Sequence, residues 1–199
     1  MTTENPNNDS ELWNAFKNGQ EDAYLKIYDL HYKYLFTYGF RLSSNKMLTD
    51  DCIQELFLEL WTNRSTVSDV KRIRPYLLTY LKRKIFSELK RSPEYEIKEF
   101  DQHLVEKSFE TSLIAQENEQ IISQQLEKAI SQLTNRQREI LHLKYFQELS
   151  YEEISEVASI KVSRVYNLMY EAIKALRKQL TSVVVWLSLV SSVCDSLRL

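Results

Sequence analysis

Glycine and proline are nearly absent from this sequence, with two glycines and three prolines among 199 residues. These residue types make the tight turns that a many-stranded sandwich or barrel needs every few residues, so their scarcity argues against both architectures. It also excludes collagen-like chains and Gly- or Pro-rich disordered chains. The two glycines, Gly19 and Gly39, lie too far apart to form a glycine-rich phosphate-binding loop. The sequence therefore predicts an all-α protein.

Cysteine and histidine are too few and too scattered for a metal site. Cys52 and Cys194 form no CxxC pair and the three histidines stand singly, so we predict no metal and no cofactor. Cys52 falls on the apolar side of a helical pattern, which is typical of a small core residue. The N-terminus has neither a basic region nor an apolar stretch, so we expect no signal peptide and a reduced, cytoplasmic setting.

Apolar residues recur at helical spacing along most of the chain. They predict helices near residues 10–18, 21–42, 50–62, 71–91, 118–132, 135–145, 150–158 and 162–180. Gly19 is a plausible C-cap, and Thr49 and Thr134 are plausible N-caps. Ser150 followed by Glu153 predicts a capping box.

The near-zero net charge conceals strongly charged segments. Residues 71–91 hold eight Lys/Arg and one Glu, a net +7, and residues 161–180 hold five Lys/Arg and one Glu, a net +4. Residues 94–127 hold nine Asp/Glu and two Lys, a net −7, and the first part of this segment lacks periodicity, as a linker does. We therefore predict two small helical bundle domains, 10–91 and 118–180, joined by an acidic linker, 92–117, and followed by an apolar tail, 181–199.

The second predicted domain contains a short helix, a tight turn near residues 159–161 and a second helix with a polar, basic start. This order is typical of a helix-turn-helix, whose second helix inserts its N-terminal end into the major groove of DNA. The side chains placed to reach base edges or phosphates are Lys161, Ser163, Arg164, Tyr166 and Asn167. By pattern alone, an ordinary helical hairpin with a solvated charged face fits equally well.

Aromatic and basic residues alternate in the segment 71–91. Basic side chains neutralise phosphates and aromatic rings stack on unpaired bases, so the segment is a candidate for binding a single strand. The candidates are Tyr76, Tyr80, Lys82, Arg83, Lys84, Lys90 and Arg91. A bundle helix with a solvated basic face is the alternative for this segment alone. The preceding helix, 50–62, is apolar around much of its circumference because of Leu58 and Trp61, so it is either central to a bundle or covered by a partner.

Taken together, these segments resemble a sigma factor of bacterial RNA polymerase, of the small two-domain extracytoplasmic-function type. Residues 126–180 follow the pattern of the module that reads the promoter −35 element, with Leu133-Thr134 and Arg138, Glu153-Ile154, and Leu176-Arg177 in register. DDCIQELFLELW, 50–61, is similar to the family's polymerase-docking helix, and RPYLLTYLKRKIFSELKR, 74–91, to its strand-melting segment. The resemblance covers about residues 10–91 and 118–180.

The resemblance implies a mechanism and a set of partners. Helix 50–62 would dock on a coiled coil of the polymerase β′ subunit through Asp51, Gln54, Glu55, Leu58 and Trp61. The basic–aromatic segment would capture bases of the −10 strand, the helix-turn-helix would read the −35 duplex, and the linker would thread the polymerase interior. The implied partners are core RNA polymerase and promoter DNA, with an anti-sigma factor as a further candidate and no small-molecule substrate. The protein would not itself be an enzyme.

Departures from the family pattern limit what carries over. Ser155 and Ser159 stand where the family usually has Ala and Gly, and a left-handed backbone at a serine costs more than at a glycine. Leu168 and Glu171 stand where basic residues are common in the recognition helix, and Arg83 and Ser87 replace a frequent Asn and Asp. Promoter preference therefore does not transfer.

Two other function classes compete with this interpretation. A stand-alone helix-turn-helix regulator would use the N-terminal bundle for dimerisation or sensing and would bind DNA without polymerase. An enzyme is disfavoured because no paired carboxylates, nucleophile–base set or metal cluster stands out. The uncharged stretch 181–194 is shorter than the roughly 20 residues that span a bilayer. It fits a last helix or strand packed on the body, a docking tail for a partner, or weak membrane contact.

Overall fold

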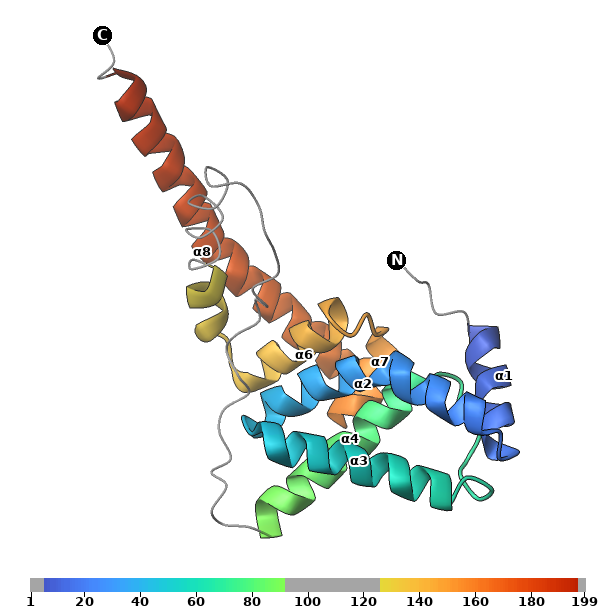
Figure 1. The fold of residues 1–199 in the computed structure, drawn as a ribbon. Helices are drawn as coiled ribbons and strands as arrows, with labels where there is room; N and C mark the ends of the chain where they lie inside the picture. The colour runs from blue at the N-terminus through green and yellow to red at the C-terminus, as the bar shows by residue number, and fades with distance from the viewer. Residues whose placement is uncertain (1–5, 92–125, 197–199) are drawn as a thin grey trace. The chain divides into compact units, whose positions relative to one another are not determined.

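The computed structural model describes residues 6–91 and 126–196, with side chains for residues 9–91 and 126–179. The described residues form helices and turns without a strand, which confirms the all-α prediction (Figure 1). Contacts divide the chain into two compact units. The first comprises Met1–Asp101 with Leu149–Ile160, and the second comprises Gln102–Glu148 with Lys161–Leu199. The predicted linker, 92–117, lies outside the described residues.

The first unit contains five described helices. They are α1 (Pro6–Lys17), α2 (Glu21–Ser43), α3 (Lys46–Thr62), α4 (Ile73–Arg91) and α7 (Tyr151–Ala158). Helices α2, α3 and α4 pack on one another, and α7 packs on α4 (Figure 1). Fully buried side chains from these helices form one core, including Trp13, Ile27, Leu56 and Leu81. Cys52 is buried in this core, as its position in the pattern predicted.

Gly39 permits the close approach of three helices. A Cβ at this position would lie 2.9 Å from Thr49 Cγ2 on α3 and 3.1 Å from Ile85 Cδ1 on α4. Gly19, with φ +83°, ends α1 in the left-handed conformation, as expected of a C-cap glycine. The two glycines of the chain thus serve one helix crossing and one turn.

The caps follow the sequence except at α3. The predicted capping box of α7, between Ser150 and Glu153, is confirmed. At α3 the prediction of Thr49 as cap is wrong: Asn45 caps the helix by accepting from Leu48 N at 3.1 Å. Thr49 lies buried inside the helix, where its hydroxyl donates to Asn45 O at 2.7 Å.

The second unit contains a helical stretch at residues 126–131, α6 (Asn135–Tyr145) and α8 (Val162–Ser196). Thr134 caps α6 in a capping box with Gln137, as predicted for the cap. Helices α6 and α8 pack together over a core that includes Ile140, Leu143, Val165 and Met169. The predicted end of the last helix at residue 180 is too early, because α8 continues as one helix to Ser196.

Candidate nucleic-acid interface

Helix α4 carries the basic–aromatic segment. Pro75 lies in its first turn, where proline's fixed φ suits a helix start. One face of α4, with Leu77, Leu81 and Ile85, is buried in the first unit's core. The period of 3.6 residues turns the intervening polar and aromatic positions outward.

The two predicted strand-binding tyrosines lie half-buried on this helix. The Tyr76 ring meets Trp13 edge to face at a centroid distance of 5.3 Å, and its burial raises the pKa of its hydroxyl. The Tyr80 ring lies 6.4 Å from that of Tyr76. Both rings line the same cleft and can offer a stacking face there.

Lys84 is held within the first unit by two carboxylates of α3. Its Nζ lies 2.8 Å from Glu59 Oε1 and 2.9 Å from Glu55 Oε2, and its side chain is only 13% exposed. The other Glu59 oxygen accepts a hydrogen bond from the Tyr80 hydroxyl. Burial and this bond raise the pKa of Tyr80 to about 12, while the bonds from Lys84 and Tyr80 lower the pKa of Glu59. Of the seven α4 candidates, Lys84 and Tyr80 therefore have partners on α3.

Most of the remaining α4 candidates are exposed. Arg83, Lys90 and Arg91 are exposed, whereas Lys82 is half-buried and its Nζ donates to Val157 O at 3.2 Å. Arg91 Nη1 pairs with Glu88 Oε1 of its own helix at 2.9 Å. A row of cations thus follows the outer side of α4, where it can track the phosphates of a single strand.

Sequence reasoning missed Arg72 and Thr79, which line the same cleft as Tyr76, Tyr80 and Arg83. Arg72 belongs to the basic segment but precedes the helix, so the helical aromatic pattern does not include it. A cation directly before the first turn of a basic helix is the sequence signal that could have identified Arg72 as a cleft residue.

All five residues predicted to read the −35 duplex are exposed in the first turns of α8 or just before it: Lys161, Ser163, Arg164, Tyr166 and Asn167. The opposite side of the same turns is buried through Val165, Leu168 and Met169. Leu168 is a core residue, which explains why it departs from the basic residues common at this place. Ser159, in the turn before α8, adopts the left-handed conformation with φ +55°.

The predicted polymerase-docking residues of α3 share one exposed face. Asp51, Gln54, Glu55 and Leu58 are all exposed and recur at helical spacing. Leu58 is 64% exposed, more than Leu25 at 56% or Leu30 at 49% on α2. Trp61 differs, because it is half-buried against Tyr24, with ring centroids 5.0 Å apart.

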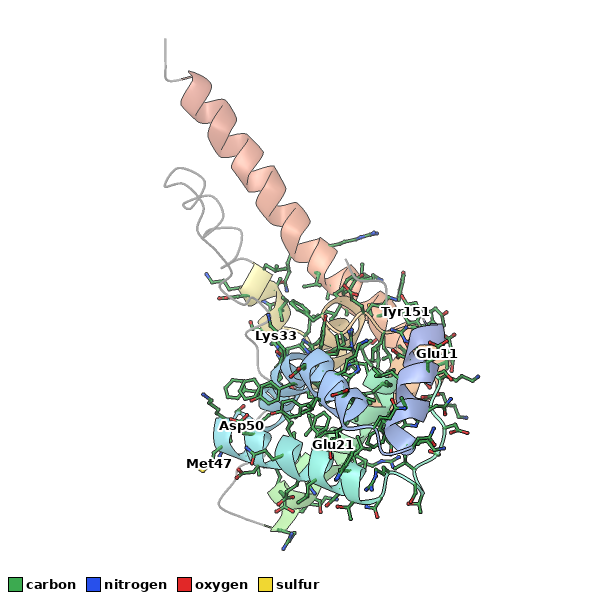
Figure 2. All side chains as sticks on the ribbon, turned by 45° about the vertical axis from the view of Figure 1, so that its right-hand side comes forward. Glu11, Glu21, Lys33, Met47, Asp50 and Tyr151 are labelled. Atoms are coloured by element: carbon green, nitrogen blue, oxygen red, sulfur yellow. The ribbon has the colours of Figure 1, made fainter. Side chains whose placement is uncertain are left out.

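Met47 extends this face by one turn and was missed by sequence reasoning. It is 71% exposed and lies four residues before Asp51 on α3 (Figure 2). Met47 was missed because the prediction of Thr49 as the cap left Met47 outside the predicted helix. Moving the start of the helix to the next upstream capping residue, Asn45, would have found it.

A row of aromatic rings runs along α2 beside the start of α3. Tyr28, Tyr32, Phe36 and Phe40 stack at four-residue spacing, with centroids 5.4 to 6.1 Å apart. The Tyr32 hydroxyl donates to Asp50 Oδ1 at 2.7 Å. This bond raises the pKa of Tyr32 to about 12.

Comparison with known families matches both modules in order. The family model described as Sigma-70 region 2 matches residues 27–93, and that described as Sigma-70, region 4 matches residues 123–176. The chain belongs to the sigma-70 family. It is a sigma factor, which directs core RNA polymerase to promoter DNA. The region 2 match excludes the stand-alone regulator, whose N-terminal bundle would have no reason to match a sigma module.

Relatives and solved structures agree with this assignment. RNA polymerase sigma factor YlaC of Bacillus subtilis (strain 168) is 24% identical over 163 residues, 80% of this chain and 93% of the relative. The structure of CnrH in complex with the cytosolic domain of CnrY has a TM-score of 0.57 at 18% identity, over 87% of this chain and 97% of that one. The sigma factor RpoE in complex with the anti-sigma factor NepR from Bartonella quintana has a TM-score of 0.53 at 19% identity, over 77% and 94%. The two structures share the fold of this sigma factor.

The described residues offer neither a membrane-spanning helix nor a metal cluster. No helix among them is both long and apolar enough to cross a membrane. Nor do three or more of their His, Cys, Asp and Glu side chains gather in a way that could hold a metal ion.

Proposed function

We propose that three surfaces divide the work of this sigma factor between polymerase and the two promoter elements. The docking face on α3 consists of Met47, Asp51, Gln54, Glu55 and Leu58. The strand-binding face on α4 consists of Tyr76, Tyr80, Lys82, Arg83, Lys90 and Arg91. The duplex-reading end of α8 consists of Lys161, Ser163, Arg164, Tyr166 and Asn167.

The docking face suits a basic helical surface such as the polymerase β′ coiled coil. Two carboxylates and an amide precede Leu58 on this face, so an apolar contact would be bordered by polar ones, as in typical interfaces. Trp61 contributes by packing: its ring, with Arg64 above it at 4.4 Å, supports the end of α3. The single observation that carries this proposal is that Leu58, at the C-terminal end of the face, is exposed next to polar side chains.

The strand-binding face combines cations with two half-exposed rings. Extracting bases from a duplex costs a few kcal/mol, and stacking together with phosphate contacts offsets that cost. We assign Lys84 a positioning role, because its ammonium already pairs with Glu55 and Glu59. Polymerase supplies all catalysis, the chain acts in the cytoplasm, and regulation by an anti-sigma factor fits the complexes formed by CnrH and by RpoE.

Reconstitution with core polymerase tests the docking face. Leu58→Glu should weaken core binding by about tenfold or more, since it buries a charge in an apolar contact. Leu25→Glu is the matched control, because Leu25 on α2 is 56% exposed and lies outside the docking face. Equal binding of the two variants to core polymerase would refute the docking assignment.

Arg164→Ala separates the duplex-reading end from the docking face. It should weaken −35 duplex binding by the holoenzyme by about five- to tenfold, the effect of one lost base or phosphate contact, and leave core binding unchanged. Loss of both activities together would contradict the division of surfaces.

A further inference from the structure

Helix α1 lies before residue 27, where the region 2 match begins, yet it contacts the segment that leads into the strand-binding face (Figure 1). This segment is the connection from α3 to α4, residues 63–72, and it has two parts. In the first part the N–H groups of Thr66 and Val67 donate to Asn63 O at 2.8 and 3.2 Å, so hydrogen-bonded turns continue the end of α3. Residues 68–72 are neither helix nor turn, so contacts with other parts of the unit fix their course.

Asp9 of α1 caps the N-terminus of α4. The first N–H groups of a helix have no partner within it, and the side chain of the preceding residue usually accepts from them. Arg72, which precedes α4, has a side chain with donors only and cannot do so. The Ile73 N–H donates instead to Asp9 Oδ2 at 3.0 Å, across 64 residues of sequence. Asp9 is only 7% exposed, and the positive end of the α4 dipole favours its negative charge.

Two further residues of α1 hold the second part of the connection. Trp13 Nε1 donates to Ser68 O at 3.0 Å, and Lys17 Nζ lies 2.5 Å from Asp69 Oδ1. Asp9, Trp13 and Lys17 recur every four residues, so one side of α1 makes all three contacts. Helix α1 therefore binds the connection at two successive residues and α4 at its first residue.

Trp13 also reaches the strand-binding face itself. Its ring meets that of Tyr76 edge to face at a centroid distance of 5.3 Å. Trp13 is 1% exposed, so the surrounding core holds its ring in place. A base stacks only on the face of a ring, so the orientation that Trp13 gives to Tyr76 determines whether that face is offered. One buried side chain thus links the connection to a ring proposed to stack on a base.

We infer that α1 is a positioning element for strand binding, in which Asp9, Trp13 and Lys17 fix residues 68–76 before a strand arrives. This inference rests on the proposed strand-binding face. A strand that meets a fixed helix start does not have to offset the entropy of ordering it, so it binds more tightly. The three residues of α1 are positioning residues, because each acts through the connection or the start of α4 and none is proposed to touch the strand.

The test replaces the Asp9 cap in the full chain bound to saturating core polymerase. Asp9→Ala removes the acceptor for the Ile73 N–H, whereas Asp9→Asn keeps one, since Asn and Asp cap helices about equally well. Asn45→Ala is the matched control, because it removes the cap that Leu48 N donates to at the start of α3, and saturating core offsets any effect on docking. Fluorescence anisotropy measures binding to a labelled single-stranded DNA of about 16 nucleotides, the upper site size of a single-strand module, with core polymerase alone as background.

Asp9→Ala should weaken strand binding by about fivefold, because the strand then has to order the start of α4. Asp9→Asn and Asn45→Ala should stay within about twofold of wild type, and amide hydrogen exchange of Ile73 should accelerate in Asp9→Ala but not in Asp9→Asn. If α1 only stabilised the unit, the two lost caps would be equivalent. Equal weakening by Asp9→Ala and Asn45→Ala would therefore overturn the inference, and so would failure of Asp9→Asn to restore binding.

Lys17→Met tests the other end of α1 independently. The side chain of Asp69 is 83% exposed, so loss of this ion pair should leave the unit folded. Lys26→Met, at an exposed lysine of α2, is the control for the loss of one positive charge. Lys17→Met should bind the strand about twofold more weakly than Lys26→Met in the same assay, and equal affinities would overturn the role assigned to Lys17.

Arg83→Ala distinguishes failure of the inference from failure of the proposed strand-binding face. If Arg83→Ala weakens strand binding while Asp9→Ala binds as wild type does, the face is correct and the positioning role of α1 is refuted. If Arg83→Ala leaves strand binding unchanged, the proposed face itself fails.

Discussion

Lys84 and Arg83 are neighbours in sequence with opposite surroundings, and substituting each by methionine separates structure from DNA binding. Methionine keeps an unbranched apolar stem and removes the charge. Lys84 is 13% exposed and paired with two carboxylates, whereas Arg83 is exposed beside both clefts. We expect Lys84→Met to lower the stability of the first unit and Arg83→Met to lower its affinity for a strand.

The expected loss for Lys84→Met follows from its two contacts. A buried hydrogen bond to a charged group contributes about 1.5–3 kcal/mol, and an exposed ion pair about 0.2–1 kcal/mol. Glu59 and Glu55 are 45% and 58% exposed, so solvent screens both pairs, and the Glu55 pair more. We therefore expect a decrease in the free energy of unfolding of about 1.5 kcal/mol. Arg83→Met should stay within about 0.5 kcal/mol of wild type, as surface substitutions do.

Urea unfolding followed by tryptophan fluorescence measures this difference. Trp13 and Trp61 both belong to the first unit, and a Trp186→Phe background removes the third tryptophan of the chain. Strand binding by the holoenzyme supplies the second measurement: Arg83→Met should weaken it by about fivefold and Lys84→Met by less than about twofold. The reasoning is refuted if Lys84→Met leaves stability unchanged and weakens strand binding as much as Arg83→Met.

Three further predictions concern backbone geometry and pH. Gly39→Ala should destabilise the first unit by about 1–2 kcal/mol despite alanine's helix propensity, because Thr49 Cγ2 would lie 2.9 Å from the new Cβ. Urea unfolding measures this loss of stability, and a stabilised variant would contradict the close helix crossing. Ser159 has a φ of +55°, which glycine adopts at lower cost, so Ser159→Gly should stabilise α7 by about 0.5–1 kcal/mol and slow its amide exchange. Ser159→Ala should not slow the exchange. Because the pKa of Glu59 is lowered in the folded chain, its contribution exists above the ordinary carboxylate pKa of about 4.3 and disappears as pH falls through the folded value. The stability difference between wild type and Glu59→Gln, measured by urea unfolding, should therefore shrink below about pH 4, and a constant difference would argue against a charged Glu59.

Local signals in the sequence were sufficient wherever a structure depends on a few neighbouring residues. The capping box of Ser150 and Glu153 needs only two residues three positions apart, and it formed as predicted. The start of α3 failed because two capping residues, Asn45 and Thr49, compete within one turn. Gly39 on α2 lacks a side chain, and this leaves room for Thr49 inside the packed helices, so that Asn45 is the residue at the helix start. No local pattern carries that information.

The candidate site shows the same division between local and distant determinants. The resemblance to a polymerase-docking helix singled out Asp51, Gln54 and Leu58, and all three are exposed on α3. The sequence could not reveal that Lys84 pairs with Glu59, because that contact joins two helices across 25 residues of sequence. A lysine in a basic segment looks the same in the sequence whether it faces a phosphate or a carboxylate.

The surroundings of α4 explain how a helix with so many cations folds. Carboxylates approach it from two sides, from α3 through Glu55 and Glu59 and from α7 through Glu153. On the α3 side the helices share a close-packed core that includes Leu56, Leu60 and Ile85. On the α7 side the contact encloses clefts of about 710 and 390 Å³. Helix α7 also buries apolar side chains, those of Ile154, Val157 and Ala158. The carboxylates of α3 therefore hold Lys84 at a packed interface, whereas Glu153 of α7 pairs with Arg72 at the edge of a cleft.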